Sequence, residues 1–286
     1  MILFVLILLL LLFIYLYLNY YRVYYFNLKK LFRSKISPRK IGKYYDKWKN
    51  EYCKYYGEVL QAHRSENVEE MLDYIIKSAG IEEGYKILDA GCGYCGPAIF
   101  FANKVKNIKI EAITISKEQY EYGLQAIKNK KVEGNINLRL GDYHKLVSLY
   151  PLQSFDLVYF LESYGHATNQ TKVLKQAVEM LKPGGKLYIK DYFMAENFNG
   201  ILNKYRMRKS ISNLNKVYRY NLPDIYHTIY VLRKAGMELV FIKKPSFNWN
   251  KGITVIDFQK NNNINLFDGI KVVKNVEVFE LLFKKP

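Results

Sequence analysis

The chain has 286 residues, of which 44 are Lys or Arg and 26 are Asp or Glu, so its formal net charge is +18. Half of the residues are hydrophobic and 24% are charged, which excludes a disordered or collagen-like chain and predicts one large or two modest domains. Three cysteines are too few for a disulfide scaffold. The basic excess suggests nucleic-acid binding only if the charges gather on the folded part of the chain.

The chain begins with 18 apolar or aromatic residues that no Gly, Pro or charged residue interrupts. Eighteen helical residues rise about 27 Å, close to the thickness of a hydrocarbon core. Asn19, Tyr20 and Tyr21 extend the segment to the interface, where Tyr is favoured. A cleaved signal peptide is the alternative, but no basic residue precedes the run and no small-residue cleavage site follows it. We therefore predict an uncleaved transmembrane anchor over residues 1–21.

Residues 22–54 form a basic juxtamembrane segment. Eleven Lys or Arg against two acids give it a net charge of +9, half of the total of +18. Such a flank beside one spanning helix predicts a single-pass membrane protein whose remaining chain is cytoplasmic, and it favours contact with anionic lipid head groups. A solvated basic linker is the alternative. Because the anchor explains the charge, no nucleic-acid partner is expected. Glycosylation of the sequon Asn169-Gln170-Thr171 would contradict this orientation.

From residue 55 to residue 286 the sequence alternates between strand-like and helix-like segments, which predicts one α/β domain. A mostly parallel, seven-stranded sheet with helices on both faces accounts for this order. The expected strands cover residues 85–90, 109–114, 137–140, 155–161, 186–192, 238–243 and 277–283. One expected helix begins at Pro97, and three others cover residues 117–128, 172–181 and 224–235.

A glycine-rich turn, Asp89-Ala90-Gly91-Cys92-Gly93-Tyr94-Cys95-Gly96, follows the first expected strand. Ligands of open parallel sheets bind at the carboxyl ends of the strands. Glycines at such an end allow the backbone to approach a ligand closely. The bare G-x-G-x-x-G pattern also occurs in dinucleotide-binding proteins and has little specificity alone.

Five ordered motifs resemble those of class I S-adenosylmethionine-dependent methyltransferases. The nearest branch holds the sterol and tocopherol C-methyltransferases and the cyclopropane fatty acid synthases. The motifs are Ile87–Ala98, Ile113–Gln119, Gly141–Tyr143, Phe155–Val158 with Glu162–Ala167, and Leu181–Gly185. The resemblance covers roughly residues 42–245. It implies a Rossmann-like fold and S-adenosyl-L-methionine as the cofactor.

The resemblance also assigns a cofactor site. Gly91 and Gly93 would pass beneath the methionine part of the cofactor, Asp89 would accept from its amino group, and Asp142 would accept from the adenine amino group. An ordinary turn or cap is the alternative for each aspartate. The implied cofactor-binding residues are Asp89, Gly91, Cys92, Gly93, Thr114, Ile115, Gln119, Asp142, Tyr143 and Glu162.

The sequence departs from the family pattern at two positions. Cys95 replaces the usual glycine and can crowd either the loop or the packing of the helix. Thr114 replaces the acid that binds the ribose in the wider class, so Gln119 is expected to supply part of that contact. Cys92 and Cys95 suggest zinc or redox chemistry, but a structural zinc needs four ligands. Cys53 and four scattered histidines do not complete such a set, so no metal is expected.

Three residues after the fourth expected strand are the predicted catalytic groups. Glu162 and His166 are four apart, so one helical turn can bring them together, and either can act as the base. Tyr164 suits an alkene acceptor, because aromatic faces and a carboxylate stabilise a carbocation. A hydrogen-bonded structural histidine is the alternative for His166.

Two flanking regions are expected to cover the site. In the resembled branch the region of Tyr56 and Gln61 helps to cover the cofactor. The insertion near residues 193–221 is expected to form a lid over the acceptor. It carries six Lys or Arg, which face either a lipid head group or the solvent.

Together these features predict a membrane-tethered methyltransferase whose partners are membrane lipids and a small lipophilic acceptor, such as a sterol, an isoprenoid or another lipid. Lipid modification of the cyclopropane-synthase kind is an alternative with the same cofactor. A nucleic-acid-binding basic protein is a second alternative, although base-flipping motifs are absent after the fourth strand. A scaffold without catalytic activity is a third.

Overall fold

The computed structural model describes residues 7–15, 36–194, 201–247 and 276–286. The chain divides into two compact units, Met1–Ser37 and Pro38–Pro286. Residues 7–15 of the first unit are helical. The rest of the predicted anchor and residues 22–35 of the basic segment lie outside the described residues. Within the described ranges, no helix combines the length and the apolar character needed to cross a membrane.

The second unit begins earlier than the sequence suggested. Helices α2 (Pro38–Lys47) and α3 (Lys49–Tyr56) belong to it, so the predicted boundary at residue 55 falls inside the unit. The reason is packing, because Ile41, Tyr44 and Tyr56 are buried despite the basic residues around them. Counting charge hid this apolar face of α2 and α3.

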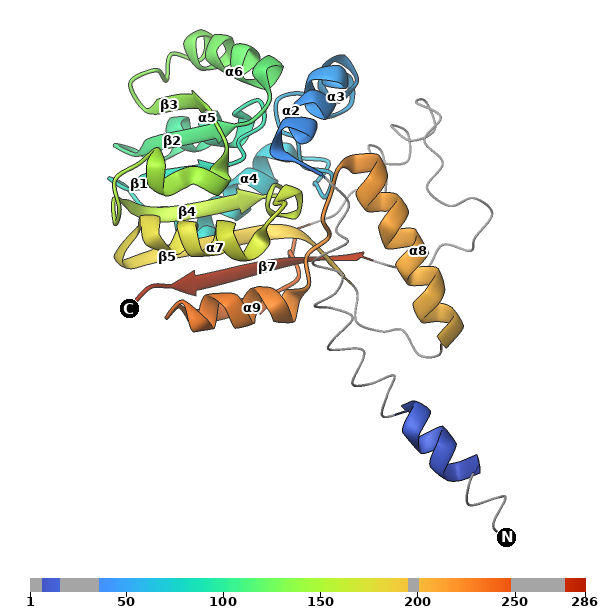
Figure 1. The fold of residues 1–286 in the computed structure, drawn as a ribbon. Helices are drawn as coiled ribbons and strands as arrows, with labels where there is room; N and C mark the ends of the chain where they lie inside the picture. The colour runs from blue at the N-terminus through green and yellow to red at the C-terminus, as the bar shows by residue number, and fades with distance from the viewer. Residues whose placement is uncertain (1–6, 16–35, 195–200, 248–275) are drawn as a thin grey trace. The chain divides into compact units, whose positions relative to one another are not determined.

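The predicted seven-stranded α/β sheet is confirmed, with the strand order β3-β2-β1-β4-β5-β7-β6 (Figure 1). The first five strands run parallel, and β7 pairs antiparallel with both β5 and β6. The bounds are β1 Lys86–Ala90, β2 Lys109–Thr114, β3 Ile136–Leu140, β4 Phe155–Leu161, β5 Leu181–Met194, β6 Glu238–Lys243 and β7 Val276–Lys284. Strand order reverses between β1 and β4, so a ligand crevice is expected at their carboxyl ends.

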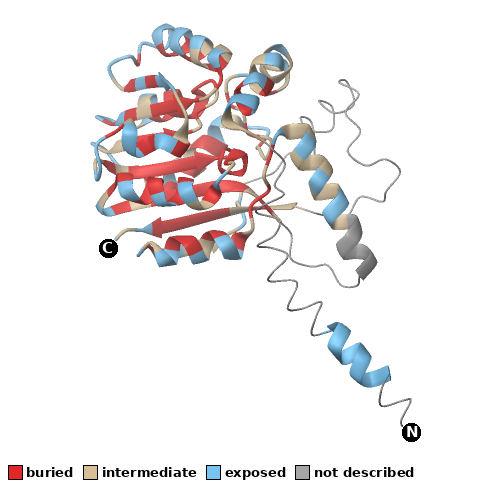
Figure 2. Cartoon of the chain, in the orientation of Figure 1, coloured by how far each residue is buried: buried red, intermediate tan, exposed pale blue. Residues whose placement is uncertain are grey.

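Helices cover both faces of the sheet, as predicted. One hydrophobic cluster joins the sheet to α4 (Val68–Ala79), α5 (Gly96–Lys104) and α6 (Lys117–Asn129). The other joins it to α7 (Gln170–Met180) and α9 (Ile225–Lys234). Figure 2 shows the buried sheet between partly exposed helices. Helix α8 (Ile201–Tyr218) lies within the expected lid region, although the side chains of residues 201–206 are not described.

Polar caps explain where the helices begin. Ser116 accepts from the backbone N–H of Gln119 and starts α6, whereas Asn169 accepts from that of Lys172 and starts α7. The cap places the start of α7 two residues before the predicted position. Strand β5 is longer than predicted because its pairing with β7 continues to Met194. Two short 3-10 turns, η1 (Tyr143–Ser148) and η2 (Tyr164–His166), follow β3 and β4.

Candidate active site

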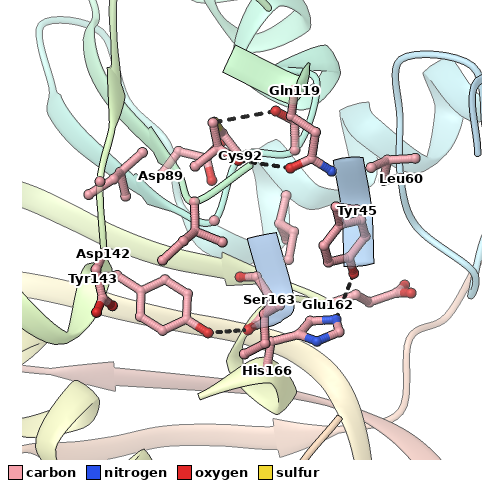
Figure 3. A pocket seen from close by; sticks show the side chains of 18 of the residues that line it. Tyr45, Leu60, Asp89, Cys92, Gln119, Asp142, Tyr143, Glu162, Ser163 and His166 are labelled. Carbon is pink, nitrogen blue, oxygen red and sulfur yellow. Dashed lines mark hydrogen bonds between the residues drawn. The ribbon is translucent and has the colours of Figure 1, made fainter. Parts of the chain in front are cut away.

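A cavity lies at the carboxyl ends of β1, β2 and β4 and includes about 790 Å³ of space between protein atoms, part of it open to solvent (Figure 3). Every predicted cofactor-binding residue lines it. These residues are Asp89, Gly91, Cys92, Gly93, Thr114, Ile115, Gln119, Asp142, Tyr143 and Glu162. The crevice therefore lies where the change in strand order places it, and residues far apart in the sequence share one wall.

The loop after β1 needs glycine at Gly91. Its φ is +103°, and a Cβ there would lie 2.6 Å from the Cβ of Ser163. The backbone N–H groups of Gly91 and Cys92 both donate to the carbonyl of Ile113 at 3.0 Å, which fixes the loop to the end of β2. The loop can thus pass close beneath a ligand without a side chain in the way.

Cys95 adopts the left-handed conformation that explains why the family favours glycine there. Its φ is +66°, and it precedes α5 without a side-chain cap. The buried thiol lies 3.5 Å from the Sγ of Cys92, and a Cβ on Gly123 of α6 would meet it at 3.3 Å. Cys95 therefore fills space between the loop and α6. No group of side chains suited to a metal ion is present among the described residues.

Asp89 is 2% exposed at the end of β1. Its Oδ2 accepts from the Tyr159 hydroxyl at 2.8 Å, and within the described ranges its Oδ1 has no hydrogen-bond partner. Burial raises the pKa of Asp89 to about 7, against which the Tyr159 bond acts. Asp89 thus offers its Oδ1 as an acceptor, and the charge of its carboxyl group changes with pH near neutrality.

Thr114 and Gln119 form a pair at the end of β2. The Thr114 hydroxyl donates to Oε1 of Gln119 at 2.8 Å. This bond fixes the amide of Gln119 at the cavity wall and leaves its N–H groups available. The pair occupies the place of the acid that the wider class uses, and the expected contact of Gln119 with the ribose stays a prediction.

Asp142 caps η1. Its Oδ1 accepts from the backbone N–H of His144 at 2.9 Å and from His144 Nδ1 at 2.6 Å. Burial favours the neutral acid, but these bonds outweigh it and lower the pKa of Asp142. Both bonds go to Oδ1, so within the described ranges Oδ2 remains open to accept from a ligand.

Glu162 is held in a buried ion pair with Lys190 and is not a free base. Its Oε1 accepts from Nζ of Lys190 at 2.6 Å, and its Oε2 accepts from the backbone N–H of Ala62 at 2.6 Å. Lys190, which is fully buried, also donates to Oε1 of Gln61 at 2.7 Å. Glu162 and Lys190 thereby hold the segment 61–63 against the ends of β4 and β5. Gln61 lines the cavity as expected, whereas Tyr56 does not.

His166 has a defined tautomer. Its Nδ1 lies 3.1 Å from the backbone carbonyl of Arg219, which can only accept, so Nδ1 carries the proton. Its Nε2 lies 2.7 Å from the Tyr45 hydroxyl and must accept from it. Burial lowers the pKa of His166 to about 4, so the ring is neutral at physiological pH. In Figure 3, Tyr45 and His166 point toward each other at the cavity wall.

Two parts of the predicted catalytic set need correction. No hydrogen bond joins Glu162 to His166 in the described part of the chain, because Lys190 and Tyr45 bind them separately. Tyr164 is fully buried, does not line the cavity, and has its hydroxyl 3.1 Å from Thr228 Oγ1. The turn η2 directs Tyr164 into the core beside α9 and leaves His166 at the cavity.

The sequence analysis missed the contribution of α2. Pro38, Ile41 and Tyr45 of this helix line the cavity, as do Leu60 and Ser163. The apolar spacing of Ile41, Tyr44 and Tyr45 is typical of a helix that packs on one side and was the available signal.

The comparison with known families agrees with this geometry. A family model described as "Methyltransferase domain" matches residues 81–258. The chain is 29% identical over 176 residues to 27-O-demethylrifamycin SV methyltransferase of Amycolatopsis mediterranei, which covers 59% of this chain and 64% of the relative. It is 26% identical over 213 residues to cycloartenol-C-24-methyltransferase of Arabidopsis thaliana, covering 71% and 61%.

A solved structure supports the fold. The crystal structure of the [4+2]-cyclase SpnF superposes with a TM-score of 0.70 at 17% identity, over 87% of this chain and 96% of that one. The chain matches less than two thirds of the length of the two relatives named above. The family model, however, matches more than half of this chain, and the matched range contains the five motifs. The chain belongs to the methyltransferase domain family, with the class I α/β fold.

Proposed function

We propose that the chain is an S-adenosylmethionine-dependent methyltransferase that modifies a small lipophilic acceptor. The observation that carries the proposal is the convergence of all ten predicted cofactor residues on one cavity at the switch point of the sheet. Two of the relatives are named as methyltransferases, which supports the same reaction class.

The cavity fits the cofactor in its donors and acceptors. Nε2 of Gln61 is buried at the cavity without a hydrogen-bond partner in the described part of the chain, so it can donate to a carboxylate. Asp89 Oδ1 and Asp142 Oδ2 can accept from the cofactor's two amino groups. Gly91 and Gly93 line the cavity and place no side chain in it. When bound, S-adenosylmethionine supplies the electrophilic methyl group.

Tyr45 and His166 suit the removal of a proton from the acceptor. An acceptor O–H or N–H can donate its proton to Oη of Tyr45 while Tyr45 passes its own proton to Nε2 of His166. Arg219 O stabilises the resulting imidazolium by accepting from Nδ1. A carbon acceptor that becomes a carbocation can lose its proton to the same pair. We therefore assign the proton transfer to Tyr45 and His166, and the positioning of the segment 61–63 to Glu162.

The lining of the cavity and the relatives support the proposed acceptor class. Pro38, Ile41, Leu60, Pro97 and Leu161 give the cavity a largely apolar wall. One relative is named for a sterol-type substrate, cycloartenol. A membrane anchor over residues 1–21, with the catalytic domain on the cytoplasmic side, would keep the site near a poorly soluble substrate.

Mass spectrometry of lipids from cells that express the protein or its His166→Gln variant tests this proposal. We expect one defined lipid to gain one methylene only with the unsubstituted protein. A product that gains the methylene but loses a carbon–carbon double bond would indicate cyclopropanation instead. An unchanged lipid profile, with methylation found on RNA or protein, would contradict the acceptor class.

A further inference from the structure

Helix α2 has two chemically different faces. Its outward side chains follow the spacing i, i+1, i+4, i+8 and are all exposed and basic. We call these four residues the basic face: Arg39, Lys40, Lys43 and Lys47. The opposite side of the helix is buried at Ile41, Gly42 and Tyr44.

The inner face fixes how α2 sits on the domain. A Cβ on Gly42 would lie 2.7 Å from the carbonyl oxygen of Ile115, so the helix backbone touches the end of β2. Asp46 Oδ1 accepts from the Ser116 hydroxyl at 2.6 Å. Ile41 and Tyr45 line the cofactor cavity. Because these contacts prevent rotation, the basic face must point away from the domain.

Arg39 and Lys43 form no ion pair within the described ranges. The neighbouring acids have other partners, since Asp46 binds Ser116 and Glu118 binds Lys49 at 2.7 Å. Helix α8 carries five Lys or Arg and no acid in its sequence. His166 connects this helix to α2, because its Nδ1 donates to the carbonyl of Arg219, just after α8, and its Nε2 accepts from Tyr45 of α2.

We propose that the basic face rests on an anionic lipid surface while the inner face of the same helix closes over the cofactor cavity. Charge complementarity favours anionic head groups. The apolar run 1–18 ends twenty residues before α2, so the chain can place this helix at most about 70 Å from a bilayer that the run enters. A nucleic acid fits less well, because Tyr44 is buried and Tyr45 lines the cavity, so neither tyrosine ring of α2 is placed on the basic face to stack on bases.

The consequence is that lipid contact and cofactor retention are coupled. A lipid surface that holds α2 in this position also holds Ile41 and Tyr45 at the cavity, so the cofactor binds more tightly on an anionic membrane. This inference rests on the proposed function only for the identity of the cofactor. The contact with lipid stands on the geometry of α2.

Hydrogen exchange of the full-length protein in nanodiscs tests the inference. Discs of phosphatidylcholine alone are compared with discs that contain about one third phosphatidylserine. We expect the amides of α2 to exchange about tenfold more slowly on the anionic discs, and the Kd of S-adenosylmethionine to fall there by a similar factor. Arg39→Glu with Lys43→Glu should remove both differences.

The matched control reverses two exposed charges near the amino ends of β2 and β3, whereas α2 packs just after the carboxyl end of β2: Lys106→Glu with Lys128→Glu should keep both differences. Equal exchange of α2 on both discs, or loss of the effect in the control, would overturn the proposal. So would stronger protection of α2 by a nucleic-acid duplex than by the anionic discs. Failure to insert into neutral discs would refute the anchor alone, since the basic face must then still bind anionic vesicles. Absent cofactor binding on every disc would refute the methyltransferase proposal.

Discussion

Burial sets the protonation of two cavity residues in the same physical way, with opposite consequences for charge. It raises the pKa of Asp89 to about 7 and lowers that of His166 to about 4, because a low-dielectric site disfavours the charged form of each. His166 is therefore a neutral proton acceptor across the physiological range. Asp89 changes charge within that range.

Cofactor binding should therefore depend on pH through Asp89. Below about pH 7 the Asp89 carboxyl is protonated and loses its attraction for the cofactor's ammonium group, so the Kd should rise as pH falls, by up to about tenfold per pH unit. Calorimetric titrations between about pH 5.5 and 8.5 measure this. Asp89→Asn should flatten the dependence, whereas Asp73→Asn should not, because Asp73 does not line the cavity and pairs with Lys104 instead. An unchanged slope in Asp89→Asn would assign the titration to another group.

Turnover should depend on Tyr45 and His166. Removing a general base costs about 10²–10⁴ in rate, so His166→Gln should lower kcat at least about 100-fold, and Tyr45→Phe about tenfold. The Kd of the cofactor should change less than about twofold. His227→Gln, on an exposed part of α9, is the control. Because His166 titrates near pH 4, kcat should show no inflection near pH 6.5. If His166→Gln leaves kcat unchanged, His166 is a structural residue and not the base.

At the scale of elements, the buried pair between Glu162 and Lys190 ties three segments together. It joins the end of β4 and strand β5 to residues 61–63, and Glu162 has a φ of +54° within this arrangement. Buried charges are tolerated only when they are paired and hydrogen-bonded. Residues 61–63 approach the cavity because the pair holds them, so its effect on binding is indirect.

Lys190→Met should therefore destabilise the fold and weaken cofactor binding. Leaving Glu162 buried without its cation should lower the free energy of unfolding by about 3–5 kcal/mol. The double variant Lys190→Met with Glu162→Gln should lose less than Lys190→Met alone, since no unpaired charge remains. Denaturant titration measures the free energy of unfolding of both variants. A double variant as unstable as the sum of the two single variants would mean that the residues do not act as a pair.

For the whole molecule, local sequence signals were enough to predict the sheet and the residues that line one wall of the cavity. The residues from Asp89 to Gly93 follow a strand directly, and strand ends converge by topology, so their meeting required no knowledge of side-chain contacts. Tyr45 could not be assigned, because its partner His166 lies 121 positions away. Tyr164 was placed wrongly because the direction of a side chain in a short turn depends on packing. The anchor over residues 1–21 stays a prediction.

The central claim is that the cavity of this domain binds S-adenosylmethionine. Calorimetric titration of the full-length protein with the cofactor tests it most directly. We predict saturable one-site binding with a Kd of about 1–100 μM, weakened at least about tenfold by Asp142→Ala and unchanged by Asp73→Asn. Absence of binding by the folded protein, or equal affinity in all three proteins, would contradict the account.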